Sequence, residues 1–171
     1  IKFCETLYED HNLDIVCLMP TNVYGENDKF DAVDGHVIPA IIKKIENAKK
    51  KGRNFVKLLG TGKPLREFIH SNDLASAIVL SLEIKKKNLK KIFKNKLPIL
   101  NVGTNDQISI KKLSSLIAKY SNFKGKIIFD KNSPDGTFKK NLDSSKINQL
   151  GWFPKINFYE GLKQVIQSRI S

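Results

Sequence analysis

Two side chains of this chain have the chemistry to move a proton and to hold a phosphate. His36 stands just before the apolar residues 37–39, and a histidine titrates near neutrality, so it can supply a proton without a large change of environment. Arg66 is one of only three arginines and lies in an otherwise apolar stretch; a guanidinium grips phosphate oxygens with paired N–H donors. For His36, the alternative is a capping or packing residue at a helix start.

The segments that position these side chains alternate between strand and helix patterns, which predicts an α/β fold. The apolar run 14–19 ends at Pro20, as a buried parallel strand would. Isoleucines recur at helical spacing after His36, with Pro39 in the first turn, where its missing N–H is tolerated. The lysine-rich segment 85–96 is expected to be a mobile surface loop. Residues 7–12 are predicted to be the end of a helix. Further strands are predicted at 55–59, 66–70, 99–103 and 126–130. Further helices are predicted from a cap at Ser71 or Asn72 through Leu82, at 110–120 capped by Ser109, at 144–150 and at 159–170.

The residues after the first strand are candidates for ligand binding. Pro20, Thr21, Asn22 and Val23 follow its carboxyl end, where open α/β sheets bind their ligands. A rigid turn that merely ends the strand is the alternative. The other histidines lack such a setting, so His11 is expected at the surface and His70 in a structural role.

Composition excludes several classes of protein. No run of about 18 apolar residues exists, so we expect no membrane span. The net charge is +13, but 27 of the 30 basic residues are lysine. Nucleic-acid readout favours arginine and interleaved aromatic rings, so we expect a solvated lysine surface and no nucleic-acid partner. Cys4 and Cys17 have no metal-ligand spacing and no signal peptide precedes them, so buried free thiols, no metal and a cytoplasmic location are expected.

Five motifs in order resemble one enzyme family over nearly the whole chain. Tyr24-Gly25, and Arg66-Glu67-Phe68 with Asp73-Leu74-Ala75, resemble extended short-chain dehydrogenases in general. The segments 36–39 and 133–137 resemble the C-terminal half of the GDP-L-fucose synthase family. The resemblance implies a Rossmann-type α/β fold in which residues 1–35 end the NADP-binding domain. Residues 36–171 would then be mainly a smaller mixed α/β substrate-binding domain, with some segments returning to the Rossmann sheet.

The resemblance also implies a reaction. Its members use NADPH to epimerise carbons 3 and 5 of GDP-4-keto-6-deoxy-D-mannose and then to reduce carbon 4. The ketone acidifies the protons on both carbons, and inversion needs a base on one face and an acid on the other. His36 matches the family's general acid. The family's nicotinamide site matches four turn residues together with the same histidine: Pro20, Thr21, Asn22, Val23 and His36.

Substrate-binding residues carry over by the same resemblance. Arg66 and Lys140 would hold the diphosphate, Lys44 the nucleotide sugar and Asp135 the nucleoside, while Asn22 faces the substrate. The neighbours Lys43 and Lys139 could serve equally well in place of Lys44 and Lys140. Leu59 stands where the family usually has tryptophan, so the apolar character of the site is kept but an N–H donor is lost.

Two features of the family are absent from the sequence. A glycine-rich nucleotide loop and a Tyr-x-x-x-Lys pair would both lie before Ile1, so this chain alone is expected to lack the reductive machinery. The family forms homodimers in its full-length enzymes. Two other interpretations remain open: a nucleotide-sugar 4-epimerase or 4,6-dehydratase of the same superfamily, and a non-catalytic basic domain that binds nucleic acid or anionic surfaces.

Overall fold

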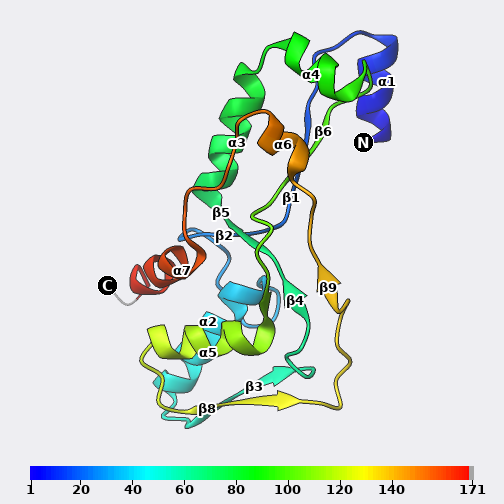
Figure 1. Cartoon of the computed structure of the whole chain (residues 1–171). Helices are drawn as coiled ribbons and strands as arrows, with labels where there is room; N and C mark the ends of the chain where they lie inside the picture. The colour runs from blue at the N-terminus through cyan, green and yellow to red at the C-terminus, as the bar shows by residue number, and fades with distance from the viewer. Residues whose placement is uncertain (170–171) are drawn as a thin grey trace.

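The computed structural model describes residues 1–169, and they form the mixture of helices and strands that an α/β fold requires (Figure 1). The predicted last residue of the final helix, Ile170, lies outside the described residues. In chain order the elements are α1 (Lys2–Asp10), β1 (Cys17–Pro20), β2 (Asn22–Tyr24), α2 (Val37–Lys50), β3 (Phe55–Leu59), β4 (Leu65–Arg66), β5 (Phe68–His70), α3 (Ser71–Glu83), α4 (Lys86–Phe93), β6 (Ile99–Val102), β7 (Ile108–Ser109), α5 (Ile110–Tyr120), β8 (Lys126–Asp130), β9 (Lys139–Lys140), α6 (Ser145–Gln149) and α7 (Phe158–Gln167).

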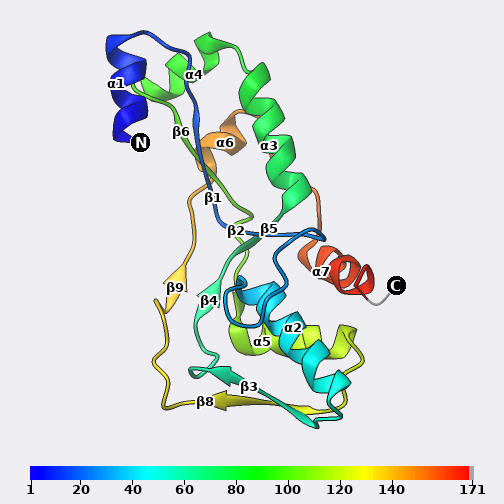
Figure 2. The ribbon, with the colours of Figure 1, turned by 180° about the vertical axis from the view of Figure 1, so that it is seen from behind.

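The strands pair mostly in parallel with partners far along the chain. β1 pairs with β6, β2 with β5 and β3 with β8, each in parallel. β4 lies between β9, which is parallel to it, and β7, which is antiparallel. Seen from both sides, β3 and β8 lie below α2 and α5 at one end of the molecule (Figures 1 and 2).

The buried apolar side chains form two clusters. The helices that carry most of them lie toward opposite ends of an elongated molecule (Figure 2). The first is built on α2, α5, α7 and β3, with Ile45 and Leu113 completely buried. The second joins β5, β6, α3, α4 and α6 around Leu100 and Val102. The segment from β4 to β5 runs from the first cluster to the second, and Phe68 and Ile69 bury their side chains in different clusters.

The predicted helix starts at α2 and α5 are confirmed. α2 begins at Val37 with Pro39 in its first turn, and its isoleucines face the core. At α5, the Ser109 hydroxyl accepts a hydrogen bond from the Lys112 N–H at 3.1 Å. This bond satisfies one of the free N–H groups of the first turn.

The prediction of a mobile loop at 85–96 was wrong, because residues 86–93 form helix α4. Leu89 and Phe93 lie four residues apart on one face and are each only 8% exposed. Their burial against the second cluster stabilises the helix, since short helices depend on packing of an apolar face. The lysines occupy its other faces.

The cap predicted for α3 was also misplaced. The helix begins at Ser71, and the residue that caps it is His70, not Ser71 or Asn72. The Nδ1 atom of His70 accepts a hydrogen bond from the Asn72 N–H at 3.2 Å. His70 is only 3% exposed, which agrees with its predicted structural role, and His11 is exposed as expected.

The first strand is parallel, as predicted, but it is not buried. β1 has a strand neighbour only on its β6 side among the described residues, and Met19 is 40% exposed. Cys4 and Cys17 are free but only partly buried, which corrects the prediction of buried thiols. Burial and the neighbouring Cys4 raise the pKa of the Cys17 thiol.

Three short strands, β2, β7 and β9, were not predicted from the sequence. β2 has three residues and β9 has two, and both are defined by their partners β5 and β4. Within residues 1–169, no helix has the length and apolar character that crossing a membrane requires.

Candidate functional site

Four of the predicted substrate-binding residues line a single groove of about 310 Å³, here called the Arg66 groove. They come from four separate segments: α2, the end of β3, β4 and the turn 134–136. The predicted residues that line it are Lys44, Leu59, Arg66 and Asp135. The fold therefore gathers residues that are scattered along the sequence.

The structure distinguishes between the two neighbouring lysines of α2. The Nζ atom of Lys43 lies 3.5 Å from a carboxylate oxygen of Glu46. Lys44 instead lines the Arg66 groove. Only Lys44 is therefore placed beside Arg66.

The guanidinium of Arg66 is held beside the turn at 134–136. Its Nη1 atom donates hydrogen bonds of 2.7 Å to the carbonyl oxygens of Leu65 and Thr137. A Cβ atom added at Gly136 would lie only 3.3 Å from Nη2. These contacts fix the plane of the guanidinium while leaving it on the groove wall.

Asp135 makes its hydrogen bonds within the protein. Its Oδ1 accepts from the Thr61 N–H at 2.8 Å, and its Oδ2 accepts from the Thr61 hydroxyl at 2.5 Å. The hydrogen bond from this hydroxyl, followed by the one from the N–H, lowers the pKa of the Asp135 carboxyl. Gly60 has φ +80°, and a Cβ atom there would overlap Oδ1 of Asp135. Sequence reasoning missed Thr61, although it stands between two glycines that need this tight turn.

His36 lies at the N-terminus of α2, with 84% of its side chain exposed. It occupies the N-cap position of α2, as the capping alternative requires, but its side chain makes no capping hydrogen bond. Its Nδ1 lies 4.0 Å from Oδ1 of Asp28, a distance at which a carboxylate attracts a protonated imidazole. Gly35 and Val37, on either side of it, line the Arg66 groove, so His36 stands at the rim of that groove.

A second cavity of about 460 Å³, here called the Asn22 cavity, lies at the carboxyl end of β1. Pro20, Thr21 and Asn22 line it together with both candidate lysines, Lys139 and Lys140. Its position therefore leaves the choice between these lysines open. Val23 is not part of the lining; it pairs with Ile69 and packs on the second cluster.

The groove and the cavity share one segment of backbone. Arg66 pairs directly with Lys140 between β4 and β9. The Asn22 side-chain amide donates to the Glu67 carbonyl at 2.7 Å, and the Thr21 hydroxyl donates to the same oxygen at 3.1 Å. Residues 66 and 67 thus connect the Arg66 groove with the Asn22 cavity.

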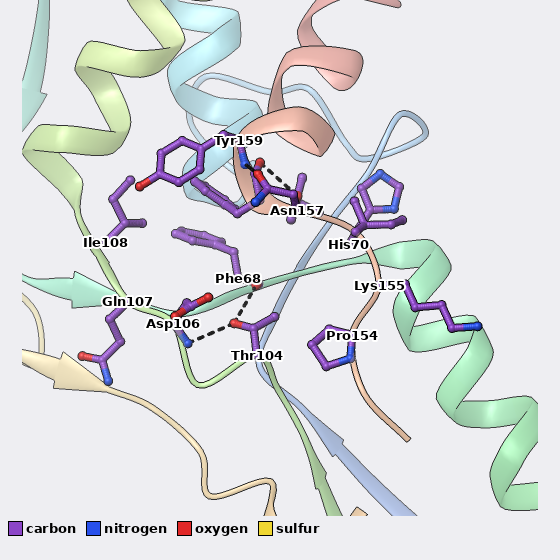
Figure 3. A pocket seen from close by; sticks show the side chains of 13 residues that line it. Phe68, His70, Thr104, Asp106, Gln107, Ile108, Pro154, Lys155, Asn157 and Tyr159 are labelled. Atoms are coloured by element: carbon purple, nitrogen blue, oxygen red, sulfur yellow. Dashed lines mark hydrogen bonds between the residues drawn. The ribbon is translucent and has the colours of Figure 1, made fainter. Parts of the chain in front are cut away.

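A separate cavity of about 430 Å³ lies between the 104–108 loop and α7, and contains no predicted site residue (Figure 3). Phe68 and His70 reach it from β5. The Nε2 atom of His70 lies 3.6 Å from Glu26. Tyr24 is also in its wall, and burial raises the pKa of its phenol.

Within residues 1–169, no group of three His, Cys, Asp or Glu side chains lies close enough together to bind a metal ion. The chemistry of the described site therefore has to be read from its histidine, its arginine, its lysines and its turn residues.

Comparison with known proteins identifies the family. The model of the NAD dependent epimerase/dehydratase family matches residues 1–103. This chain belongs to that family. Its motifs at Tyr24-Gly25 and at Arg66 to His70 lie within the matched part.

Among epimerase/dehydratase relatives, the resemblance to GDP-L-fucose synthases is confirmed. The chain is 39% identical over 164 residues to GDP-L-fucose synthase 1 of Arabidopsis thaliana, covering 96% of this chain and 48% of the relative. It is 36% identical over 167 residues to GDP-L-fucose synthase of Escherichia coli (strain K12), covering 98% of this chain and 52% of the relative. The chain thus spans about half the length of the curated relatives it matches.

Solved structures agree with this membership of the epimerase/dehydratase family. The fold matches a GDP-6-OMe-4-keto-L-xylo-heptose reductase from C. jejuni with a TM-score of 0.85 and 29% identity, covering 99% of this chain and 57% of that one. The Rossmann-type α/β prediction is therefore confirmed as a fold class.

Proposed function

We propose that this chain is the GDP-sugar-binding half of an NADPH-dependent enzyme that converts GDP-4-keto-6-deoxy-D-mannose to GDP-L-fucose. The observation that carries the proposal is the shared segment at Arg66 and Glu67. It joins a groove that holds a guanidinium and an ammonium to a strand-end cavity, with His36 at the rim. The GDP-L-fucose synthases at 36–39% identity support the choice of reaction.

The diphosphate fits the cationic side of the site. Arg66 keeps its orientation through its bonds to Leu65 and Thr137, and paired N–H donors bind phosphate oxygens better than a point charge does. Lys140 lies opposite Arg66 in the register of β4 and β9. Lys44 adds a third positive charge on the groove wall. We propose that these three residues hold the GDP group.

His36 is proposed to act as the general acid during epimerisation. A base removes the proton from carbon 3 or carbon 5, and the electron pair moves into the ketone to form an enolate. The imidazolium of His36 then gives its proton to the opposite face of the same carbon, which inverts it. The exposed ring, beside Asp28 and without a capping bond, is free to meet a substrate at the groove rim.

The turn at 20–22 is proposed to hold the nicotinamide end of NADPH, which supplies the hydride for reduction at carbon 4. The Asn22 cavity, at about 460 Å³, has a volume typical of small-ligand sites. The Thr21 N–H donates to the Val102 carbonyl at 3.0 Å, and both side chains of the turn are bonded to Glu67. The turn is therefore held in place before a ligand arrives.

The test is an assay of the complete product of the gene with GDP-4-keto-6-deoxy-D-mannose in deuterated water. The wild-type protein should incorporate deuterium at carbons 3 and 5 and, with NADPH, form GDP-L-fucose. His36→Gln should lower this incorporation by about 10²–10⁴-fold while GDP still binds. Unchanged inversion at both carbons in His36→Gln would remove His36 from the reaction.

A second candidate is a reductase of another GDP-4-ketosugar that does not invert both carbons. The match to the heptose reductase favours it, as does Leu59, which is 69% exposed in the groove where the family usually has tryptophan. In the same assay it would show reduction of a ketosugar without deuterium at carbons 3 and 5.

We propose further that the second apolar cluster, with β1 and β6, is part of the nucleotide-binding domain, and that the first cluster is the core of the substrate domain. The active enzyme would be a homodimer in the cytoplasm, and this chain by itself would not catalyse the reduction. Supplying this chain with a nucleotide-binding half and measuring NADPH oxidation tests the last point.

A further inference from the structure

The carboxylate of Glu67 is completely buried, although no described cation lies against it. It accepts hydrogen bonds from three backbone N–H groups: those of Thr104 at 2.7 Å, Asn105 at 2.9 Å and Leu142 at 2.9 Å. A carboxylate offers about four acceptor positions, so these bonds occupy most of its capacity. A buried carboxylate with this pattern connects segments of backbone.

The segments that Glu67 connects all lead to the candidate site. Leu142 follows the two lysines of β9 and lines the Asn22 cavity with them. The loop at 104–105 follows β6, the strand that pairs with β1 just before the Pro20 turn. The backbone carbonyl of Glu67 accepts from Thr21 and Asn22 on that turn. One residue thus contacts both walls of the Asn22 cavity and directly follows Arg66.

The surrounding residues are shaped to fit this carboxylate. A Cβ atom at Gly103 would overlap Oε1 of Glu67, so a side chain there would displace the carboxylate. Thr104 adds a second link to β5, because its hydroxyl donates to the Phe68 carbonyl and accepts from the Asp106 N–H (Figure 3). The loop is therefore fixed to the strand by both its backbone and its side chain.

We propose that Glu67 is a positioning residue that sets the distance between the Pro20–Asn22 turn, Arg66 and the lysines of β9. It does not touch the ligand; it holds the residues that do. This inference rests on the proposed function for its ligand, but its structural part concerns only residues of this chain.

The experiment compares Glu67→Gln with the wild-type chain. An amide keeps the size of the side chain, but its nitrogen cannot accept, so at least one of the three N–H groups loses its partner. We expect the dissociation constant for GDP to rise about tenfold in isothermal titration calorimetry. We also expect backbone amide exchange to become faster at Thr21, Asn22 and 139–142.

A matched control separates positioning from general loss of stability. Asp73 is also buried, at 3% exposed, and its carboxylate accepts from the N–H groups of Lys155 and Ile156 at 2.9 and 3.1 Å. It contacts neither the Arg66 groove nor the Asn22 cavity. Asp73→Asn should lower the melting temperature as Glu67→Gln does, yet leave GDP affinity within about twofold of wild type.

The outcomes are distinguishable. Equal GDP affinities in both variants, with no local change in exchange, would overturn the positioning role. If the wild-type chain itself does not bind GDP, the proposed function fails, and the exchange data decide the inference alone. In that case faster exchange at 21–22 and 139–142 in Glu67→Gln than in Asp73→Asn supports it, and equal exchange overturns it. If Glu67→Gln does not fold, Gly103→Ala is read in the same way, since the added methyl group displaces the Glu67 side chain without replacing it.

Discussion

Asp135 binds both polar groups of Thr61, its backbone N–H and its hydroxyl, and so closes the turn 60–62 against the turn 134–136. The two residues are far apart in sequence, yet both turns contribute to the Arg66 groove. Family resemblance predicts that Asp135 binds the nucleoside of the substrate. The structure adds an internal role for its carboxylate: fixing the shape of the groove wall.

This contact predicts a dependence on pH. The pKa of Asp135 is lowered in the folded chain by its bonds to Thr61, so the contact contributes stability above the unfolded pKa of about 3.9 and loses it as pH falls through the lowered value. Melting temperatures of wild type and Asp135→Asn should therefore differ at pH 6, begin to converge below about pH 4, and become equal only once the pH lies below the lowered pKa of Asp135. A difference that stays constant down to pH 2 would contradict this.

The two lysines of α2 provide a matched pair for binding. Lys44 lines the Arg66 groove, whereas Lys43 is paired with Glu46. Lys44→Ala should weaken GDP binding about three- to tenfold, in line with roughly 1 kcal/mol for a partly exposed charge contact. Lys43→Ala should leave it unchanged. Calorimetric titration of both variants measures this, and equal losses would refute the assignment of Lys44.

Replacing Arg66 by lysine is expected to weaken GDP binding. An ammonium cannot bond Leu65, Thr137 and a phosphate in one plane, so Arg66→Lys should weaken GDP binding by about ten- to a hundredfold, or roughly 1.5–3 kcal/mol. Arg53→Lys, an exposed arginine after α2, is the control and should bind GDP normally. A GDP affinity in Arg66→Lys equal to wild type would show that the guanidinium shape does not matter.

Because residues 86–93 form helix α4 and not the loop that the sequence suggested, a core substitution in this segment should lower the stability of the protein. Leu89 is 8% exposed and packs on the second cluster, so Leu89→Ala should lower the free energy of unfolding by about 2–3 kcal/mol. Lys90→Ala, on the same helix, should change it by less than about 0.5 kcal/mol. Urea titrations measure both free energies of unfolding. If Leu89→Ala leaves the free energy of unfolding unchanged, the interpretation of this segment as a loop is favoured.

The sequence alone predicted those helices and strands whose apolar spacing or capping residue is visible within the element itself. The isoleucines of α2, the Ser109 cap of α5 and the parallel pairing of β1 all follow from local spacing or from a run of apolar residues. The residues of the Arg66 groove could be nominated only through family resemblance, because nothing local in Lys44 or Asp135 reports their common surroundings.

The errors have physical reasons. In α4 the spacing of Leu89, Ile92 and Phe93 was present, but seven lysines around it obscured the apolar face. β2 and β9 are too short to have a pattern and exist because β5 and β4 lie beside them. Glu67 was given no role of its own, although a carboxylate directly after Arg66 in an otherwise apolar stretch was a signal of its buried role.

The pairing of β1 with β6 bears on how the chain acquires its structure during synthesis. Cys17 pairs with Ile99 and Pro20 pairs with Val102, so the first strand has no described partner strand until residues 99–102 have been synthesised. Loop closure over such separations slows folding. The nascent chain therefore passes through a stage in which α2 and other local helices can form while β1 is not yet paired with β6.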